Sequence, residues 1–425
     1  MALTGFPDGP PVASPAAGLA VLERVAGELA TATRATGQEV RADPAELIAG
    51  RAAITGLTRQ GRVSAGGSTR LLRSADGWCA VTLSREADVA ALPALLGVLG
   101  SGRVPAAEDP WTALASAALA RPAHEVAGAA QLLGIPASAL PREYPQARWP
   151  PWRTTRIAAP ILPAPPASSG AARLDGAVVA DLSAMWAGPL CARLLGLAGA
   201  RVIKVESADR PDGARSGDQR FYDWLHAGHR SIALPFGTVE GRAALSALLA
   251  SADIVIEASR PRALAGLGVA PEMIAHKPGQ VWLSITGYGR DEPVLVAFGD
   301  DASVAGGLVG WTGRHWGQGE PVFCADAIAD PLTGACGALA VARSLAAGGG
   351  ELIDLPMRAV AANFAAASLP AHGAHEIAPD GTVWCAALGR AQRVLPPRTP
   401  ATAPRAARLG ADTEAVLAWL GAARG

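Results

Sequence analysis

The stretch "VVADLSAMWAGPLCARLLGLAGARVIKVE", from Val178 to Glu206, predicts a strand, a helix and a second strand. It begins with a continuous apolar run, which is typical of a strand buried on both faces of a parallel sheet. "AGPLCARLLGLAGA" has the composition of a helix, with Pro189 near its first turn, where proline is tolerated. "RVIKVE" (201–206) is again apolar enough to be a buried strand. A strand, a crossover helix and a second strand form the repeating unit of a parallel sheet.

The same alternation continues toward the C-terminus. We expect a helix at 238–252, strands at 253–258 and 279–289, and a helix that begins near Pro331. The strand "GELIDLP" (350–356) follows that helix. Strands that alternate with helices predict an α/β fold with a Rossmann-like, doubly wound open parallel sheet. Ligands of such sheets bind beyond the carboxyl ends of the strands, so we expect the functional residues in those loops.

Changes in composition divide the chain into four parts. Residues 1–150 lack the regular alternation and are predicted to form a smaller, N-terminal α+β domain. The Pro-rich segment 151–172 has no apolar periodicity and is predicted to be a linker. Residues 173–392 contain the Rossmann-like domain, and residues 393–425 are predicted to be a second linker and a helix that returns to the large domain.

Charge and cysteine pattern exclude several classes of protein. With 37 basic and 37 acidic residues the formal net charge is +0, and no Lys/Arg run indicates nucleic acid or an anionic membrane as a partner. The five cysteines are scattered without a C-x-x-C pair, which argues against disulfides and zinc and indicates a reducing, cytoplasmic location. No apolar run reaches the roughly 18 residues of a membrane span, and we expect no signal peptide. Fingerprints of NAD sites, P-loops, H-E-x-x-H zinc sites and G-x-S-x-G hydrolases are also missing.

Two aspartates lie in the small, apolar stretch "FCADAIADPLTGACGALAVA" (323–342). Asp330 precedes a predicted helix, and one interpretation is a plain N-cap that accepts backbone N–H groups of the first turn. The other is a nucleophile, because a helix N-terminus would keep the pKa of Asp330 low and its carboxylate ionised. Asp326 is expected to be a solvated loop residue. "FGDD" (298–301) is interpreted as a turn, with Asp300 as a second acid–base candidate.

Five stretches, in this order, resemble the class III CoA-transferases, the family of the formyl-CoA and carnitine CoA-transferases and the α-methylacyl-CoA racemases. They are "VVADLSAMWAGPLCARLLGLAGARVIKVE", "HAGHRSIAL", "ADIVIEASRPRALAGLGV", "VWLSITGYGR" and "AIADPLTGACGALAVA". The resemblance covers about residues 177–365 and implies the fold of that family. Asp330 matches the position of the nucleophilic aspartate of the family.

The resemblance also implies a reaction. The carboxylate of Asp330 would attack the thioester of an acyl-CoA, and the resulting anhydride would become an aspartyl-CoA thioester, from which a carboxylic acid takes over the CoA. Coenzyme A and acyl-CoA would be substrates, with no permanently bound cofactor. Coenzyme A would lie across the carboxyl ends of the strands, near Trp186, Ala187 and Glu206. Its nucleotide end would lie near His229, Arg230, Ser259 and Arg260.

The chain departs from the family pattern at several positions, and the departures leave alternatives open. An arginine common after the VIKVE-type glutamate is Ser207, a lysine is His229, and an Asn-Phe pair is Ala258-Ser259. Where the racemases have a catalytic histidine this chain has Asp300, which argues against a standard racemase. The expected activity is CoA transfer; the alternatives are an acyl-CoA racemase or isomerase and a catalytically silent CoA-binding subunit.

The order of the domains is also unusual. In the family the small domain comes after the nucleophile, whereas here residues 1–150 resemble those later segments, with Gly66 and Gly67 near the glycine-rich lid loop. A weak internal echo pairs Gly18 with Gly334 and places Ser14 opposite Asp330, so we expect one active site per chain. The family forms interlocked dimers, and the resemblance implies either a homodimer or a pseudo-dimer within one polypeptide.

Overall fold

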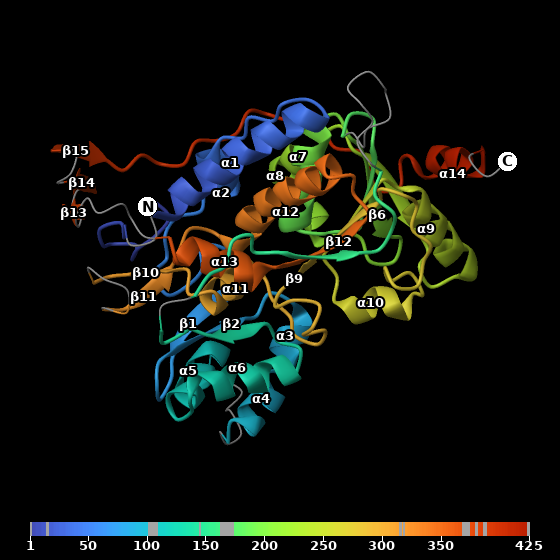
Figure 1. The fold of residues 1–425 in the computed structure, drawn as a ribbon. Coiled ribbons are helices and arrows are strands. Elements are labelled where there is room, and N and C mark those ends of the chain that lie inside the picture. The colour runs from blue at the N-terminus through green and yellow to red at the C-terminus, as the bar shows by residue number, and fades with distance from the viewer. Residues whose placement is uncertain are drawn as a thin grey trace.

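The computed structural model describes residues 2–13, 17–100, 109–143, 146–161, 174–313, 317, 319–367, 375–378, 381–385 and 389–422. Ser14 and residues 162–172, the second half of the predicted linker 151–172, lie outside these residues. Figure 1 shows a large sheet covered by helices and, below it, a smaller unit that contains α3 to α6 and strands β1 and β2. None of the described helices is long and apolar enough to cross a membrane.

The large sheet has seven strands in the order β4-β12-β9-β8-β5-β6-β7. They are β4 (Arg153–Arg156), β12 (Glu351–Pro356), β9 (Val281–Thr286), β8 (Ile254–Glu257), β5 (Val178–Asp181), β6 (Arg201–Ser207) and β7 (Arg230–Leu234). All neighbours are parallel except β4, which pairs antiparallel with β12. The predicted Rossmann-like open sheet is therefore confirmed. The strand order reverses between β5 and β8, and a ligand crevice is expected at that switch point.

Helices cover both faces of this sheet. One face carries the core formed with α1 (Ala17–Thr36), α7 (Ala187–Leu197), α8 (Gln219–His226), α12 (Ala329–Ala346) and α13 (Met357–Ala365). The other face packs against α9 (Val239–Ser251), α10 (Pro261–Gly266) and α14 (Thr413–Ala422). A 3-10 helix, η1 (Gly213–Ser216), lies in the loop after β6.

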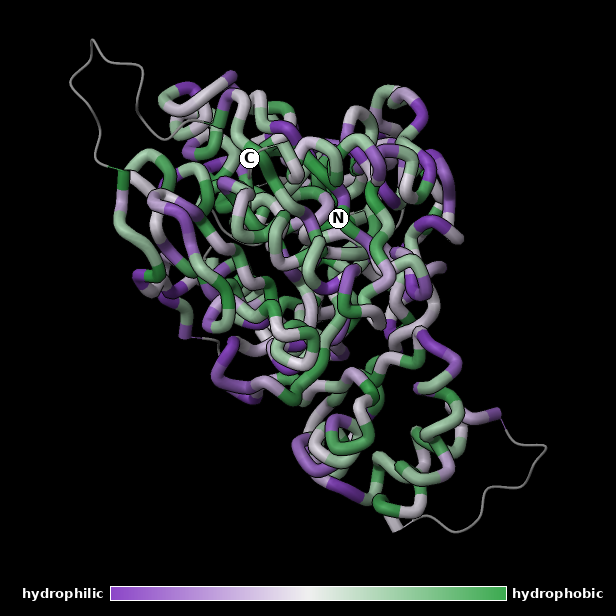
Figure 2. Tube along the Cα trace, turned by 90° about the vertical axis from the view of Figure 1, so that its right-hand side faces the viewer, coloured by the Kyte–Doolittle hydropathy of each residue, from purple (hydrophilic) through white to green (hydrophobic). Residues whose placement is uncertain are grey.

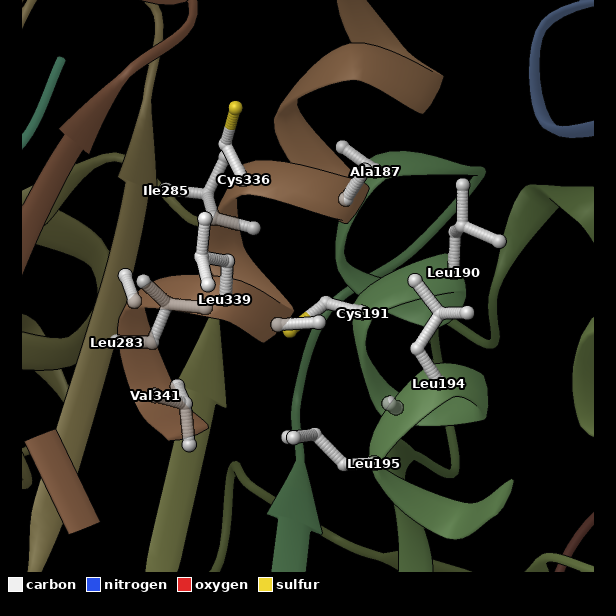
Figure 3. Packing of buried hydrophobic residues seen from close by; sticks show 14 of the residues in the cluster. Ala187, Leu190, Cys191, Leu194, Leu195, Leu283, Ile285, Cys336, Leu339 and Val341 are labelled. Atoms are coloured by element: carbon white, nitrogen blue, oxygen red, sulfur yellow. The ribbon is translucent and has the colours of Figure 1, made fainter. Parts of the chain in front are cut away.

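The contact between α7 and α12 is close because glycines lie at the crossing. A Cβ on Gly334 would lie 2.7 Å from the carbonyl oxygen of Ala187 and 2.9 Å from Cβ of Leu190. Figure 3 shows Cys191 of α7 pointing toward α12 and Leu283 of β9, and a Cβ on Gly337 of α12 would lie 3.4 Å from Sγ of Cys191. The tight packing fixes the start of α12 relative to the loop that follows β5.

The N-terminal segment packs into the large core and not only into the small unit. Helix α1 lies along α12, with Leu22, Val25 and Leu29 buried in the same core as α7 and α12 (Figure 1). Helix α2 (Pro44–Thr55) begins at the N-cap Asp43, whose side chain accepts a hydrogen bond from the N–H of Ala45. Helices α1 and α2 therefore cover α12, which would otherwise expose apolar side chains.

The small unit is an antiparallel sheet backed by helices. Its strands are β1 (Thr69–Arg73), β2 (Trp78–Thr82) and β3 (Ala137–Ala139). Its helices are α3 (Glu86–Ala90), α4 (Leu92–Val98), α5 (Pro110–Leu119) and α6 (Ala123–Leu132). The opposite face of the sheet packs against α11 (Gly299–Ala305) and the pair β10 (Val309–Trp311) and β11 (Pro321–Phe323). In Figure 2 the small unit projects from the larger body.

Several peripheral segments differ from plain linkers. The first part of the Pro-rich segment forms β4, which covers one edge of the large sheet. At the other edge, backbone N–H groups of β7 donate to the side chains of Asp412 and Thr413, just before and at the start of α14. A three-stranded sheet, β13 (His375–Ile377), β14 (Thr382–Cys385) and β15 (Arg390–Arg393), completes the described elements.

Candidate active site

Asp330 lies in the first turn of α12, at the carboxyl end of the large sheet. The helix begins at Ala329, so Asp330 is inside the helix and is not its N-cap, and its backbone N–H donates to the carbonyl of Ala327 at 2.9 Å. The side chain is half-buried. Burial, and secondly the negative charge of Asp300, raise the pKa of Asp330 to about 8, although the helix N-terminus favours a carboxylate. The prediction of a low pKa is therefore wrong, because burial among other carboxyls outweighs the helix dipole.

The turn before α12 has an unusual backbone. Ala325 and Ala327 have φ values of 56° and 40°, in the left-handed region that residues with a side chain seldom adopt. The N–H of Ala325 donates to Oγ1 of Thr4 at 3.1 Å, and that of Ala327 donates to Oδ1 of Asp300 at 3.0 Å. Hydrogen bonds to Thr4 and Asp300 therefore fix the backbone of the turn that orients Asp330.

Asp326 lies between these two alanines and is buried, not solvated as predicted. Its Oδ1 accepts a hydrogen bond from Nη1 of Arg51 at 2.7 Å, and its Oδ2 is buried without a partner among the described residues. Burial raises the pKa of Asp326, and the ion pair with Arg51 opposes that shift. The prediction failed because the cation that allows burial comes from α2, some 275 residues away in sequence.

Asp300 and Asp301 lie in the first turn of α11, where a turn had been expected. Asp301 accepts the N–H of Phe298 and the hydroxyl of Thr82, which makes it a structural cap. Asp300 accepts the hydroxyl of Thr69 at 3.2 Å, in addition to the N–H of Ala327. Burial raises the pKa of Asp300 to about 6 and that of Asp301 to about 7. Asp300 thus links the small sheet to the turn before Asp330.

The glycine before this pair makes room for the carboxyl of Asp330. A Cβ on Gly299 would collide with Oδ2 of Asp330 and with the carbonyl oxygen of Ala327. The Asp330 side chain therefore lies directly against the start of α11. Among the described residues its carboxyl has no hydrogen-bond partner, which leaves the oxygens free for a substrate.

The predicted lid residues Gly66 and Gly67 lie in an exposed loop next to this site. The loop closes where the N–H of Ser64 donates to the carbonyl of Thr69, and Gly67 has a φ of 82°. A Cβ on Gly66 would lie 3.9 Å from Nη2 of Arg51. The lid loop, Arg51 and Asp326 are thus neighbours.

Trp186 and Ala187 form the start of α7 on the other side of Arg51. The Trp186 ring packs edge-on against Phe221, with 5.4 Å between centroids, and Cζ of Arg51 lies 5.6 Å from the centroid of each ring. The carbonyl of Ala187 lies against Gly334. Both predicted residues are therefore close to the start of α12.

Glu206, Ser259 and Arg260 lie after or at the carboxyl ends of β6 and β8. Glu206 is buried and paired with Arg215 at 2.5 Å, so it shapes the loop that follows β6. The N–H of Ser259 donates to Glu257 at 3.1 Å, and Arg260 precedes α10. Burial lowers the pKa of Arg260, as do the positive charges of Arg262, Arg85 and Arg210. These arginines concentrate positive charge beside the strand-order switch point.

The structure does not bring His229 and Arg230 to this site. His229 lies against Gly196, near the C-terminal end of α7. Ala187 is at the start of that helix, and a rise of about 1.5 Å per residue puts Gly196 about 14 Å from it along the helix axis. Burial lowers the pKa of His229 to about 3, so the imidazole is neutral and does not replace the charge of a lysine. Arg230 begins β7 and is exposed.

Two cavities lie away from Asp330. A cavity of about 400 Å³ between α1 and the end of α12 is lined by residues including Arg24, Glu28 and Arg343, and one of about 150 Å³ is lined by residues including Arg193 and His229. Neither is lined by Asp330. Among the described residues no three His, Cys, Asp or Glu side chains are arranged to hold a metal.

Sequence reasoning missed Arg51, Thr4 and Gly299. Arg51 lies in "ELIAGRAAITGL" (46–57), where one arginine among small and apolar residues has the pattern of an ordinary amphipathic helix. Its role depends on the tertiary contact with Asp326, for which no local pattern exists.

Known proteins resemble parts of this chain. Residues 174–400 match the model of CoA-transferase family III. An acyl-CoA transferase of Fusarium pseudograminearum is 30% identical over 40% of this chain and 40% of its own length. A probable CoA-transferase of Mycobacterium tuberculosis is 29% identical over 60% of this chain and 39% of its own. A formyl-CoA:oxalate CoA-transferase of Escherichia coli is 32% identical over 38% of this chain and 41% of its own.

The chain spans about 40% of the length of these curated relatives. Among solved structures, a CAIB/BAIF family protein from Brucella suis is 29% identical and aligns with 45% of this chain and 54% of its own, with a TM-score of 0.40. The family model spans more than half of the sequence, including β5, α7 and the Asp330 turn. The chain therefore belongs to CoA-transferase family III.

Proposed function

We propose that this chain transfers coenzyme A between an acyl-CoA and a carboxylic acid, with Asp330 as the nucleophile. The observation that carries the proposal is the Asp330 carboxyl, which lies in the first turn of α12, against Gly299, with no hydrogen-bond partner among the described residues. A carboxyl held at a helix N-terminus and free of partners is suited to attack a carbonyl carbon.

The reaction begins when the ionised Asp330 attacks the thioester carbonyl of the acyl-CoA. The carbon–sulfur bond breaks, CoA leaves as a thiolate, and an acyl-aspartyl anhydride remains. The thiolate then attacks the aspartyl carbonyl, which releases the donor acid and forms an aspartyl-CoA thioester. The acceptor acid reverses these two steps and leaves with the CoA, and Asp330 is regenerated. First-turn N–H groups of α12 are candidates to stabilise the oxyanions.

Coenzyme A is expected at the strand-order switch point between β5 and β8. Trp186 and Ala187 border one side of that point, and Ser259 and Arg260 follow β8 on the other. The positive charges near Arg260 suit the phosphates of coenzyme A. We propose that the lid loop at Gly66 and Gly67 closes over the thioester, so that one polypeptide supplies both sides of the site.

A panel of acyl-CoAs of increasing chain length tests this function. Incubation with each acyl-CoA and its isotopically labelled free acid should give labelled acyl-CoA, because the acid released from the donor is necessarily also an acceptor. Asp330→Asn keeps the size of the side chain and should abolish the exchange. Binding of acyl-CoAs without any exchange would support a silent CoA-binding subunit instead.

A racemase or isomerase remains a second candidate because of two raised pKa values. Asp300 at about 6 and Asp330 at about 8 are both in the range of groups that transfer protons near neutral pH. Asp300, however, is held by Ala327 and Thr69. Incorporation of solvent deuterium at the α-carbon of an acyl-CoA, without exchange of the free acid, would favour this function.

A further inference from the structure

Arg51 lies where the N-terminal segment meets the turn before Asp330. It lies on α2, outside residues 174–400, and its side chain is 29% exposed. Nη1 donates to Asp326, and Asp326 is the one acceptor that the described residues offer this guanidinium. Its Nη2 lies close to the lid residue Gly66, and Cζ is 5.6 Å from the centroids of Trp186 and Phe221. Arg51 therefore contacts the turn and lies beside both the lid loop and the start of α7.

The cluster of carboxyl groups around Asp330 needs a nearby cation if an anionic substrate is to approach it. Three carboxyl groups, those of Asp300, Asp326 and Asp330, influence one another there, and Arg51 is the cation among the described residues that lowers the pKa of Asp330. An anionic acid that approaches Asp330 meets these carboxyls and is repelled unless a positive group receives it. A planar guanidinium that pairs through one nitrogen with Asp326 has further N–H donors for a second carboxylate.

We propose that Arg51 binds the carboxylate of the acceptor acid and positions it beside the aspartyl-CoA thioester at Asp330. The inference rests on the proposed function. An acceptor oxygen held by Arg51 attacks the aspartyl carbonyl, the carbon–sulfur bond breaks and CoA leaves as a thiolate. The thiolate then attacks the acceptor carbonyl and the aspartate oxygen leaves, so no oxidant or reductant is needed. Arg51 also holds Asp326, and through it the backbone that aims Asp330.

The test separates the acid from the thioester. In the exchange reaction described above, Arg51→Gln should raise the KM for the free acid at least tenfold. Labelling of Asp330 by acyl-CoA and hydroxylamine, which needs no acceptor, should persist in this variant with its pH profile moved upward. Arg51→Lys, which retains the charge but not the planar fork, should recover part of the acid affinity. Asp326→Asn, which breaks the ion pair and leaves Arg51 in place, should change kcat more than this KM.

A binding measurement keeps the inference testable even if no exchange occurs. Calorimetric titration of Asp330→Asn with the free acids of the panel should show binding, and the double variant Asp330→Asn/Arg51→Gln should lose it. Equal acid affinity of the two would overturn the role of Arg51. So would matching losses of kcat in Arg51→Gln and Asp326→Asn with an unchanged KM, since that result indicates a purely structural ion pair. Failure of wild-type labelling would instead contradict the proposed function.

Discussion

At the scale of single residues, Asp330 is subject to two opposing influences. Its place in the first turn of α12 favours the carboxylate, whereas burial and Asp300 favour the protonated acid and prevail. Arg51 acts against that shift. With a pKa of about 8, Asp330 is only partly ionised at neutral pH, so the proposed attack on a thioester should accelerate as the pH rises toward that value.

Asp330→Asn should stabilise the fold at alkaline pH. The unfolded chain ionises this aspartate near pH 4, but the folded chain ionises it only at about pH 8, so wild-type stability falls as the pH rises between these values. Each pH unit in this range is worth at most about 1.4 kcal/mol, and solvent screening of the half-buried carboxyl reduces that figure. The free energy of unfolding of Asp330→Asn relative to wild type should therefore be larger at pH 8 than at pH 5 by on the order of 2 kcal/mol. Urea titrations between pH 5 and pH 9 measure the difference. The exposed Asp209→Asn is the control, and a difference for Asp330→Asn that does not vary with pH would contradict the assignment.

At the scale of elements, the site depends on how closely α7 and α12 approach. Gly334 allows the carbonyl of Ala187 to lie against α12, and this contact sets the start of α12 relative to Trp186. The sequence predicted β5, α7 and β6 well because buried strands and a small-residue helix have strong local patterns. It did not predict the strained backbone at Ala325 and Ala327, which is held by Thr4 and Asp300 from distant parts of the chain.

Gly334→Ala should separate these two helices. The new methyl group would meet Ala187 and Leu190 at distances that require movement, so we expect a loss of about 1–3 kcal/mol in the free energy of unfolding. Gly128→Ala is a matched control in α6, because nothing lies within 4 Å of its Cβ, and it should gain about 0.5–1 kcal/mol. Equal effects of the two substitutions, measured by urea denaturation, would show that the helix contact is looser than described.

At the scale of the whole molecule, one chain combines a Rossmann-like sheet with an N-terminal segment that packs into the core of the large domain. The alternation of strands and helices predicted the sheet, and the resemblance to the family pointed to Asp330. Composition alone assigned residues 1–150 to one small domain. The apolar face of α1 predicts that the helix is packed against another element, but it does not reveal that this element is α12 of the large domain. The contact between α1 and α12 and the ion pair between Arg51 and Asp326 are long-range, so a local pattern does not reveal them.

Leu29→Ala should reveal whether the N-terminal segment is part of the large core. Leu29 is 1% exposed in the core shared with α7 and α12, so the substitution should cost about 2–5 kcal/mol. Leu19→Ala, at a position on the same helix that is 41% exposed, should change stability by less than about 0.5 kcal/mol. The loss should appear in the transition that also unfolds the sheet, followed by tryptophan fluorescence and far-UV circular dichroism. Loss of a separate, earlier transition would contradict this.

The central claim is that Asp330 forms a covalent bond with its substrate. The most direct measurement is to incubate the protein with acyl-CoA and hydroxylamine and to locate the modified peptide by mass spectrometry. We predict a hydroxamate at Asp330 in the wild-type protein and none in Asp330→Asn. A hydroxamate at another carboxyl, or no hydroxamate with any acyl-CoA that binds, would contradict the account.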